Sequence, residues 1–226
     1  MRIVVISTTV FKLCPPYGTV GYAGLEVLAY QIAVGLAQLG HEVYVVAPDG
    51  SEVPGCTVIP IGVERQVDEF GAYGGYSEVR EGNVLKRRKH EGYWQHLPEM
   101  DCIIDHGWQK CSYLLKQEGK LKCPILGVCH APVNTMFQSL PAGVEKPCIV
   151  CISEDQRRHF EALFAPAVAR VARNGIDLDH YKPLDIPRSK RFLFLARFSS
   201  VKSPDICQDV CIATGSELDL VGDTTI

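Results

Sequence analysis

The fold of this chain is decided by residues 2–47, RIVVISTTVFKLCPPYGTVGYAGLEVLAYQIAVGLAQLGHEVYVVA. The apolar run at 2–7 has the continuous hydrophobic character of a buried strand. Residues 25–40 carry leucine or isoleucine at steps of three and four, which predicts a helix that ends at Gly40. A second apolar strand follows at 42–48. Strand, loop, helix and strand in this order predict a βαβ unit.

The same alternation continues along the chain. Further strands are predicted at 57–61, 101–105, 124–130, 148–153 and 168–174, with helices near 107–117 and from a capping box at Ser153 and Gln156 towards Phe164. Continuous apolar strands separated by helices predict an α/β fold, a Rossmann-like parallel sheet with helices on both faces. The glycine-rich and charged stretch 62–99 predicts a loop and one helix.

A polar segment with two prolines, residues 177–190, is typical of a linker. After it the pattern predicts a strand at 191–197, a helix at 203–215 and a strand at 217–223. One βαβ unit buries too little apolar surface to form a domain. We therefore expect a first Rossmann-like domain over 1–183 and an incomplete second Rossmann-like domain over 184–226.

Composition narrows the class of protein. The chain has 226 residues, of which 46% are hydrophobic and 22% charged, as in soluble globular proteins. A net charge of -3 argues against general nucleic-acid binding, which needs a basic face. No apolar run approaches the roughly 20 residues of a membrane span. The first residues lack the features of a signal peptide, so we expect a cytoplasmic protein.

Ten cysteines are many for such a chain. The spacings Cys148-x-x-Cys151 and Cys207-x-x-x-Cys211 are the ones that could indicate a metal site. Cys148 and Cys151 belong to a strand pattern, which puts them on opposite faces of the sheet. We favour buried free cysteines that act as small hydrophobes, with zinc or disulfides as the alternative.

Glycines at Gly18, Gly21 and Gly24 separate the first strand from the first helix. A helix N-terminus offers free N–H groups and a positive dipole end, which suits an anionic ligand. The spacing GxxGxxG differs from the dinucleotide pattern GxGxxG, and this disfavours a nicotinamide-dependent oxidoreductase. The loop itself fits a structural turn and a ligand-binding loop equally well.

Two histidines, His106 and His130, follow predicted strands. In open α/β sheets ligands bind at the carboxyl ends of the strands. A histidine at such a place is either a structural residue or one that hydrogen-bonds a sugar hydroxyl or transfers a proton.

Arg197 ends a predicted strand, and Lys202 directly precedes the helix that Ser203 is expected to cap, with Pro204 as its first residue. Two cations at this place suit a pyrophosphate leaving group, because charge builds on that group as the bond to it breaks. Two solvated loop charges are the alternative.

Two further charged patterns have simpler interpretations. Asp177-Leu178-Asp179 looks like the DxD that holds a divalent metal on a sugar nucleotide, but its place in a linker favours turn and cap chemistry. The basic run KRRKH at 86–90 fits a solvated face, and contact with anionic lipid headgroups is the alternative.

Four segments, in order, resemble the retaining glycosyltransferases of family 4, which have the GT-B fold. They are the opening quoted above, where that family has a Gly-Gly-x-Glu loop, then CISEDQRRHF at 151–160, ARNGIDLDHYKP at 172–183 and FLARFSSVKSPD at 194–205. The first domain would then be the acceptor-side domain and the second the beginning of the nucleotide-sugar-binding domain. Asn174, Gly175 and Asp177 would shape the hinge between them.

The resemblance implies roles for single residues. Gly21, Ala23 and Gly24 would approach the donor phosphates or sugar, and Arg197 and Lys202 would bind the nucleotide diphosphate. His130 would lie near the reacting sugar and, with Arg197 and Lys202, take part in catalysis. His106 and Glu26 would lie on the acceptor or sugar side.

The resemblance also implies an activity. Such enzymes transfer a sugar from a UDP-, GDP- or ADP-sugar, with retained configuration, to a carbohydrate or lipid-linked acceptor. They need no cofactor or bound metal, and contact with a membrane surface is an additional expectation. Ala23 replaces the first glycine of the family pair, and the paired acidic motif would lie beyond Ile226. The alternative is therefore a non-catalytic sugar- or nucleotide-binding module that keeps this half of the fold.

Overall fold

The computed structural model describes residues 1–8, 11–16, 24–62, 93–107, 110–133, 143–146, 148–164, 168–200 and 202–222. Several features predicted from sequence lie outside these residues, in full or in large part: Gly18, Gly21, Ala23, the basic run 86–90 and the stretch 62–99. The two cores, the strand order and the remaining candidate residues all fall within the described part.

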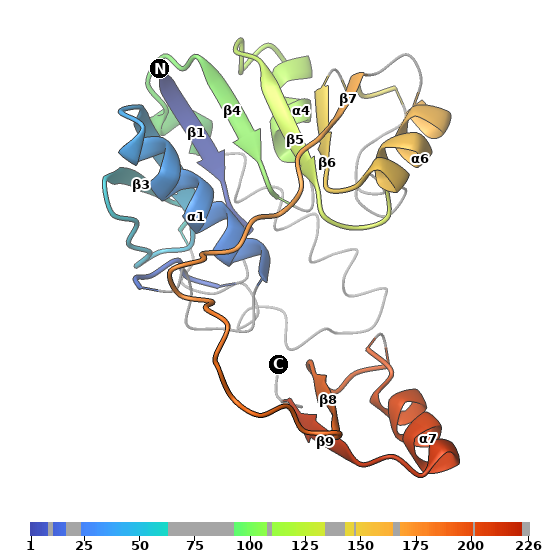
Figure 1. The fold of residues 1–226 in the computed structure, drawn as a ribbon. Helices are drawn as coiled ribbons and strands as arrows, with labels where there is room; N and C mark the ends of the chain where they lie inside the picture. The colour runs from blue at the N-terminus through green and yellow to red at the C-terminus, as the bar shows by residue number, and fades with distance from the viewer. Residues whose placement is uncertain are drawn as a thin grey trace. The chain divides into compact units, whose positions relative to one another are not determined.

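Seven parallel strands form the main sheet, in the order β3-β2-β1-β4-β5-β6-β7 (Figure 1). Their bounds are β1 Arg2–Ile6, β2 Glu42–Ala47, β3 Cys56–Pro60, β4 Cys102–Asp105, β5 Ile125–Cys129, β6 Cys148–Cys151 and β7 Val168–Val171. All seven strands were predicted within a few residues, because each one is a short, mainly apolar run, and the central strands are buried on both faces of the sheet.

Among the described residues, three α-helices connect these strands: α1 (Gly24–Gln38), α4 (Cys111–Gln117) and α6 (Glu154–Phe164). One core joins the α1 face, with Ala29 and Ala33, to alternate residues of β1 and β2. A second core joins Tyr113 of α4 and Phe160 of α6 to the other residues of the strands. The helices therefore cover both faces of the sheet, as the sequence predicts. A short 3-10 helix, η1 (Tyr93–His96), precedes β4.

The strand order creates one position where the chain changes direction across the sheet. The chain first runs from β1 outward to β2 and β3, and it returns to place β4 on the other side of β1. Ile6 pairs with Asp105, and the amide of His106 donates to the Ile6 carbonyl at 2.9 Å. Loops after β1 and β4 diverge at this point, which is where α/β sheets bind ligands.

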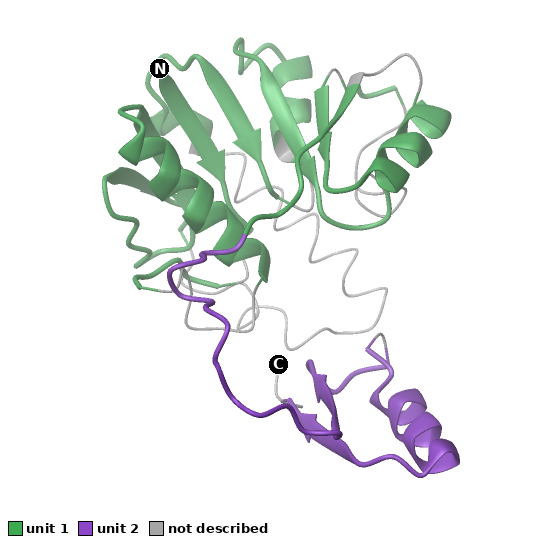
Figure 2. Ribbon diagram, viewed as in Figure 1, with its two compact units in different colours: residues 1–175 green, residues 176–226 purple. Residues whose placement is uncertain are grey.

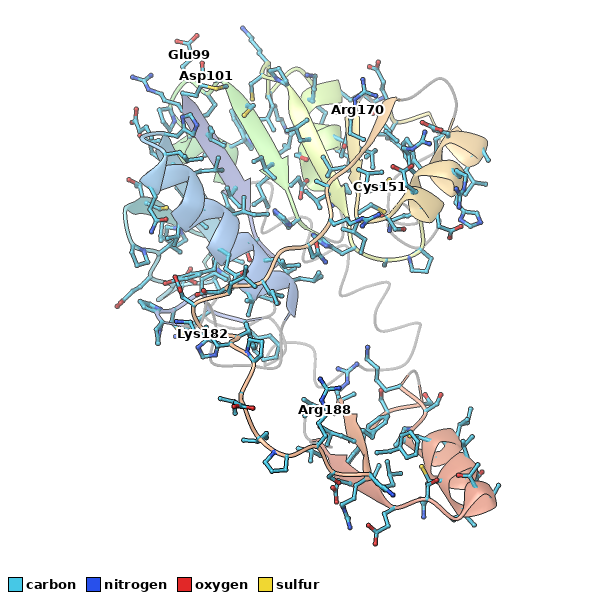
Figure 3. The ribbon with its side chains drawn as sticks, viewed as in Figure 1. Glu99, Asp101, Cys151, Arg170, Lys182 and Arg188 are labelled. Atoms are coloured by element: carbon cyan, nitrogen blue, oxygen red, sulfur yellow. The ribbon has the colours of Figure 1, made fainter. Side chains whose placement is uncertain are left out.

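The chain divides into two compact units, Met1–Gly175 and Ile176–Ile226 (Figure 2). This division precedes the expected boundary at residue 183, and both positions fall in the segment between β7 and β8, which has no helix or strand. Lys182 and Arg188 lie along this segment (Figure 3). The division into a first domain of residues 1–183 and a second of residues 184–226 stays a proposal.

The second unit contains one βαβ element. Strands β8 (Phe192–Leu195) and β9 (Leu218–Val221) pair in parallel, and α7 (Pro204–Thr214) connects them. The Arg191 guanidinium bonds the carboxylates of Asp219 and Glu217, which fixes the two strands at their start. Pro204 is the first residue of α7, as predicted.

One capping prediction needs a correction. Ser203 occupies the N-cap position of α7, but its backbone is left-handed with φ of 51° and its hydroxyl does not cap the helix. The hydroxyl donates instead to the Ser200 carbonyl at 2.9 Å. The tight turn after residue 199 imposes this conformation, and the turn therefore replaces the side-chain cap.

Candidate functional site

Polar side chains gather at the carboxyl ends of three adjacent strands. Ser7 and Thr8 follow β1, His106 follows β4, and His130 follows β5, and these strands are neighbours in the order β1-β4-β5. Ser7, Thr8 and His106 are each no more than 2% exposed. A buried polar cluster at the point where the chain changes direction is the strongest site candidate in the described part of the molecule.

The two histidines are in direct contact. His106 Nδ1 lies 2.8 Å from His130 Nε2, and the ring planes are 18° apart. The centroid separation of 5.1 Å is what that nitrogen–nitrogen distance plus two ring radii requires, so the rings meet edge to edge. This geometry is that of one shared N–H···N hydrogen bond.

Both imidazoles are held in the neutral form. Burial, with the neighbouring His130 ring and the Lys110 ammonium acting in the same direction, lowers the pKa of His106 well below its ordinary value of 6.5. Burial and Lys110 lower the pKa of His130 to about 4. Low dielectric disfavours the charged form of a base, and a nearby cation adds to this effect.

Glu26 extends the cluster from the first turn of α1. Its side chain is 3% exposed, and one carboxyl oxygen accepts a hydrogen bond from the Thr8 hydroxyl. Burial raises the pKa of Glu26 to about 7, although backbone hydrogen bonds from Glu26 and Phe11 act in the opposite direction. The helix and the end of β1 are thus joined by a carboxyl group that titrates near neutral pH.

A second layer of contacts fixes the loop that carries His106. Asp105 accepts a hydrogen bond from the Gly107 amide at 2.7 Å and another from the Ser112 hydroxyl. A side chain at Gly107 would bring its Cβ within 2.9 Å of the Asp105 carboxylate, so glycine keeps this turn closed. The buried Lys110 donates to the carbonyls of Asp105 and Val128, both at 2.9 Å.

The loop after His130 is tied to α6. The Gln156 amide N–H₂ donates to the Ala131 carbonyl at 2.8 Å. The Gln156 backbone amide donates to the Ser153 hydroxyl at 3.1 Å, which confirms the N-terminal half of the predicted capping box. The Gln156 carbonyl oxygen accepts from the Ile152 amide, one residue before the box position. The cap of α6 therefore also positions the segment next to His130.

The remaining cationic candidates belong to the second unit. Arg197 is half-buried just after β8, and Lys202 is exposed just before α7. The Lys202 and Ser203 amides both donate to the Ser199 carbonyl, at 2.9 and 3.0 Å. Both candidate cations thus lie in the segment between β8 and α7, and their role in binding stays a prediction.

Other predicted features have clear local environments. Gly24 opens α1, is exposed, and has no described heavy atom within 4 Å of where a Cβ would lie. Asp177 accepts from the amides of Asp179 and His180, at 2.9 and 3.2 Å, which is the turn chemistry expected for the DxD sequence. Gly21 and Ala23 lie outside the described residues.

The cysteines that the structure describes are free, and several of them are buried. Cys129 and Cys151 are register partners on β5 and β6, both free and both buried, and Figure 3 shows Cys151 on β6. Cys148 is only half-buried, consistent with the opposite face of the strand. No group of three or more His, Cys, Asp or Glu side chains that could hold a metal ion occurs among the described residues.

Within the described ranges, no helix combines the length and the apolar character that crossing a bilayer requires.

Sequence reasoning missed four contributors to the cluster: Ser7, Thr8, Asp105 and Lys110. Ser7 and Thr8 could have been found, because they are the first polar residues after an apolar strand and such positions meet at the carboxyl edge. Lys110 carried no signal, because a lysine next to a helix start is ordinarily exposed.

A parallel α/β sheet with a buried polar cluster at this edge is typical of Rossmann-like proteins, which bind ligands at this edge. The sequence profile of Glycosyltransferase Family 4 matches residues 22–180, which is more than half of the chain. The chain therefore belongs to Glycosyltransferase Family 4. A comparison with curated protein sequences finds no match.

Solved structures share the fold. A sucrose-phosphate synthase from Thermosynechococcus elongatus aligns with a TM-score of 0.59 and 13% identity, over 98% of this chain and 70% of that one. HepE from Anabaena, in complex with UDP and glucose, aligns with a TM-score of 0.55 and 13% identity, over 97% of this chain and 60% of that one. At such low identity these likenesses establish the GT-B glycosyltransferase fold and no more.

Proposed function

We propose that this protein transfers a sugar from a nucleoside diphosphate sugar to an acceptor, with retention of configuration at the transferred carbon. Membership of Glycosyltransferase Family 4 supports the transfer of a sugar. The relative from Anabaena was solved with UDP and glucose, which supports a nucleotide-linked donor. The same evidence favours an enzyme over a non-catalytic binding module.

The observation that carries this proposal is the buried polar cluster beside the β1–β4 switch point. Among the described residues, Ser7 Oγ, His106 Nε2 and His130 Nδ1 are buried and have no hydrogen-bond partner. Buried polar atoms are nearly always satisfied, so three such atoms at one edge indicate a place for a ligand or water. Hydroxyl groups, which both donate and accept, suit an environment of neutral polar groups.

The resemblance to the family supports the following proposed roles for single residues. His130 lies beside the reacting sugar, with His106 and Glu26 on the sugar or acceptor side. Gly21, Ala23 and Gly24 let the donor approach the start of α1, where the helix dipole favours a phosphate. Arg197 and Lys202 bind the diphosphate and stabilise the charge that develops on it as the glycosidic bond breaks.

The donor is a UDP-, GDP- or ADP-sugar and the acceptor a carbohydrate or a lipid-linked sugar. No metal or cofactor takes part in this proposal, since the two cations would neutralise the leaving group. A cytoplasmic location, with contact to a membrane surface, suits a lipid-linked acceptor.

Nucleotide binding tests the phosphate half of the proposal. Titration calorimetry with UDP, GDP and ADP should reveal one nucleotide that binds the protein. Lys202→Ala should weaken that binding about tenfold or more, because a charge-assisted contact to phosphate is lost. Lys190→Ala is the matched control, since Lys190 is exposed in the same unit but outside the turn.

The control should bind like the parent protein. Equal affinity of Lys202→Ala and the parent would remove Lys202 from the phosphate site. Absence of binding for all three nucleotides would contradict the nucleotide-sugar donor itself.

A further inference from the structure

Lys110 is the most deeply buried cation in the described part of the chain. Its side chain has no exposed surface, and its backbone is left-handed with φ of 49° at the residue that precedes α4. A buried lysine is costly unless its ammonium is well hydrogen-bonded, and a left-handed non-glycine backbone adds strain. Both the burial and the backbone conformation of Lys110 therefore cost free energy. Its contacts suggest what this cost supports.

The contacts of Lys110 point to the two histidines. Its ammonium donates to the carbonyl of Asp105, the residue before His106, and to the carbonyl of Val128, two residues before His130. Asp105 and Val128 belong to the neighbouring strands β4 and β5. One side chain thus ties together the two strand ends that carry the imidazole pair.

An uncharged imidazole pair has a defined hydrogen-bonding character. A neutral imidazole has one N–H and one lone pair, so in the contact between His106 Nδ1 and His130 Nε2 one ring donates and the other accepts. If His106 Nδ1 donates, His106 Nε2 is an acceptor and His130 Nδ1 is a donor. If His130 Nε2 donates, the two outer nitrogens exchange roles. In both arrangements the pair offers one donor and one acceptor.

Protonation would destroy this property. An imidazolium at either position would turn the outer acceptor into a donor, so the pair could no longer both donate to and accept from a ligand hydroxyl. A positive charge that acts on both rings opposes that protonation. The ammonium of Lys110 is such a charge, at the base of both loops.

We propose that Lys110 is a positioning residue that fixes the His106–His130 pair edge to edge and keeps it uncharged, so that its two outer nitrogens serve as one donor and one acceptor for a sugar hydroxyl. The choice of a sugar hydroxyl as the ligand rests on the proposed function. The uncharged state of the two imidazoles does not depend on it. Among the described residues, the titratable groups on the elements that carry or adjoin the pair include Lys110 itself, Asp105, Tyr113 and Cys129, and Glu26 lies on α1. No carboxylate is among the groups that shift the pKa of either ring.

Long-range ¹H–¹⁵N NMR of histidine ring nitrogens tests the state of the pair in the whole chain, without any substrate. Variants His106→Gln and His130→Gln assign the two rings. In the parent protein both rings should stay neutral at pH 6, each with one protonated and one bare nitrogen. An imidazolium signal from either ring at pH 6 would overturn the proposal, even if no variant at position 110 folds.

Lys110→Met removes the charge and keeps the length of the side chain. We expect at least one ring of the pair to titrate about one pH unit higher or more in this variant, because the neighbouring cation is lost. Lys110→Arg keeps the charge and should restore titration close to that of the parent. An unchanged titration in a folded Lys110→Met variant would show that the residue is only a structural tie.

Ser112→Ala is the matched control. Ser112 is also fully buried and also binds Asp105, but its loss changes no charge. Its rings should titrate as in the parent, and an equal shift in this variant would assign the effect to a loosened loop and overturn the proposal. If the protein proves not to bind or transfer sugars while the NMR result holds, the proposed function fails and the uncharged pair stands.

Discussion

At the scale of single residues, burial shifts the pKa values of acids and bases in the candidate site in opposite directions, each towards the neutral form of the group. The pKa of Glu26 is raised to about 7, and the pKa of His130 is lowered to about 4. Near neutral pH the described part of the cluster therefore contains neutral imidazoles and a carboxyl group that is about half protonated. Such an environment favours neutral hydroxyl groups over phosphates, which suits a sugar.

Glu26 gives a prediction about stability and pH. Its pKa is about 7 in the folded protein and 4.5 for an ordinary glutamate, so the folded state binds this proton more tightly. Its stabilising contribution is complete below pH 4.5 and is lost as the pH rises through 7. The loss is on the order of 3 kcal/mol, at about 1.4 kcal/mol per pKa unit.

Glu26→Gln should remove this dependence, because glutamine imitates the protonated carboxyl at every pH. Urea unfolding at pH 5 and pH 8 measures the effect. The variant should gain stability relative to the parent as the pH rises from 5 to 8. The same free-energy difference at both pH values would show that the carboxyl is not perturbed.

At the scale of elements, the packing of α4 on β5 places the loops that carry His106 and His130. Gly127 of β5 lies directly beneath Tyr113 of α4, and a Cβ there would lie 2.2 Å from the tyrosine hydroxyl. That hydroxyl donates to the Cys148 carbonyl of β6 at 2.9 Å. The glycine therefore leaves room for a hydrogen bond that joins α4 to the neighbouring strand.

Gly127→Ala should lower the free energy of unfolding by about 1–3 kcal/mol, because the methyl group overpacks this contact. Tyr113→Phe alone should cost about 1 kcal/mol for the lost hydrogen bond. The double variant should be less destabilised than the sum of the two, since phenylalanine gives back part of the space. Denaturant titration of the three variants measures this coupling.

Gly35→Ala on α1 is the control for a glycine with open surroundings, since no described atom lies within 4 Å of its Cβ position. It should leave stability unchanged or raise it, because alanine favours the helix. Strict additivity of Gly127→Ala and Tyr113→Phe would mean that the two residues do not share this space.

The sequence predicted some helices and strands of this fold better than others. Strands such as β1 and β5 were predictable because a strand buried on both faces must be an apolar run. The helix expected from residue 107 begins only at Cys111, because the Asp105–Gly107 turn and the left-handed Lys110 occupy the intervening chain. Lys110 was not predictable, because its burial depends on two carbonyls that only the parallel pairing of β4 and β5 brings together.

The pairing of His106 with His130 was partly predictable. Both follow strands, and consecutive strands are usually neighbours, so the two side chains were expected at one edge. Their hydrogen bond and the position of Ser7 beside them depend on the pairing of β4 with β1. No local sequence pattern predicts this pairing. Only the strand order of the whole sheet shows it.

At the scale of the whole molecule, the two units carry different kinds of chemistry. The first, Met1–Gly175, holds the uncharged imidazole pair at its candidate site, and the second, Ile176–Ile226, holds Arg197 and Lys202 between β8 and α7. A nucleoside diphosphate sugar has the same division, with a neutral sugar and an anionic diphosphate. Loss of His130 should therefore impair turnover, and loss of Lys202 should impair nucleotide affinity.

Turnover of nucleotide sugars by the parent protein and by His130→Ala is the most direct measurement of this account. Release of nucleoside diphosphate from UDP-, GDP- and ADP-sugars should identify a donor. NMR of the product should show that the transferred sugar keeps the anomeric configuration it had in the donor. His130→Ala should slow turnover about a hundredfold or more, as for loss of a group that acts on the reacting centre, with nucleotide affinity unchanged. His159→Ala, an exposed histidine on α6, should behave like the parent. Undiminished turnover in His130→Ala, or no turnover of any nucleotide sugar by the parent, would contradict the account.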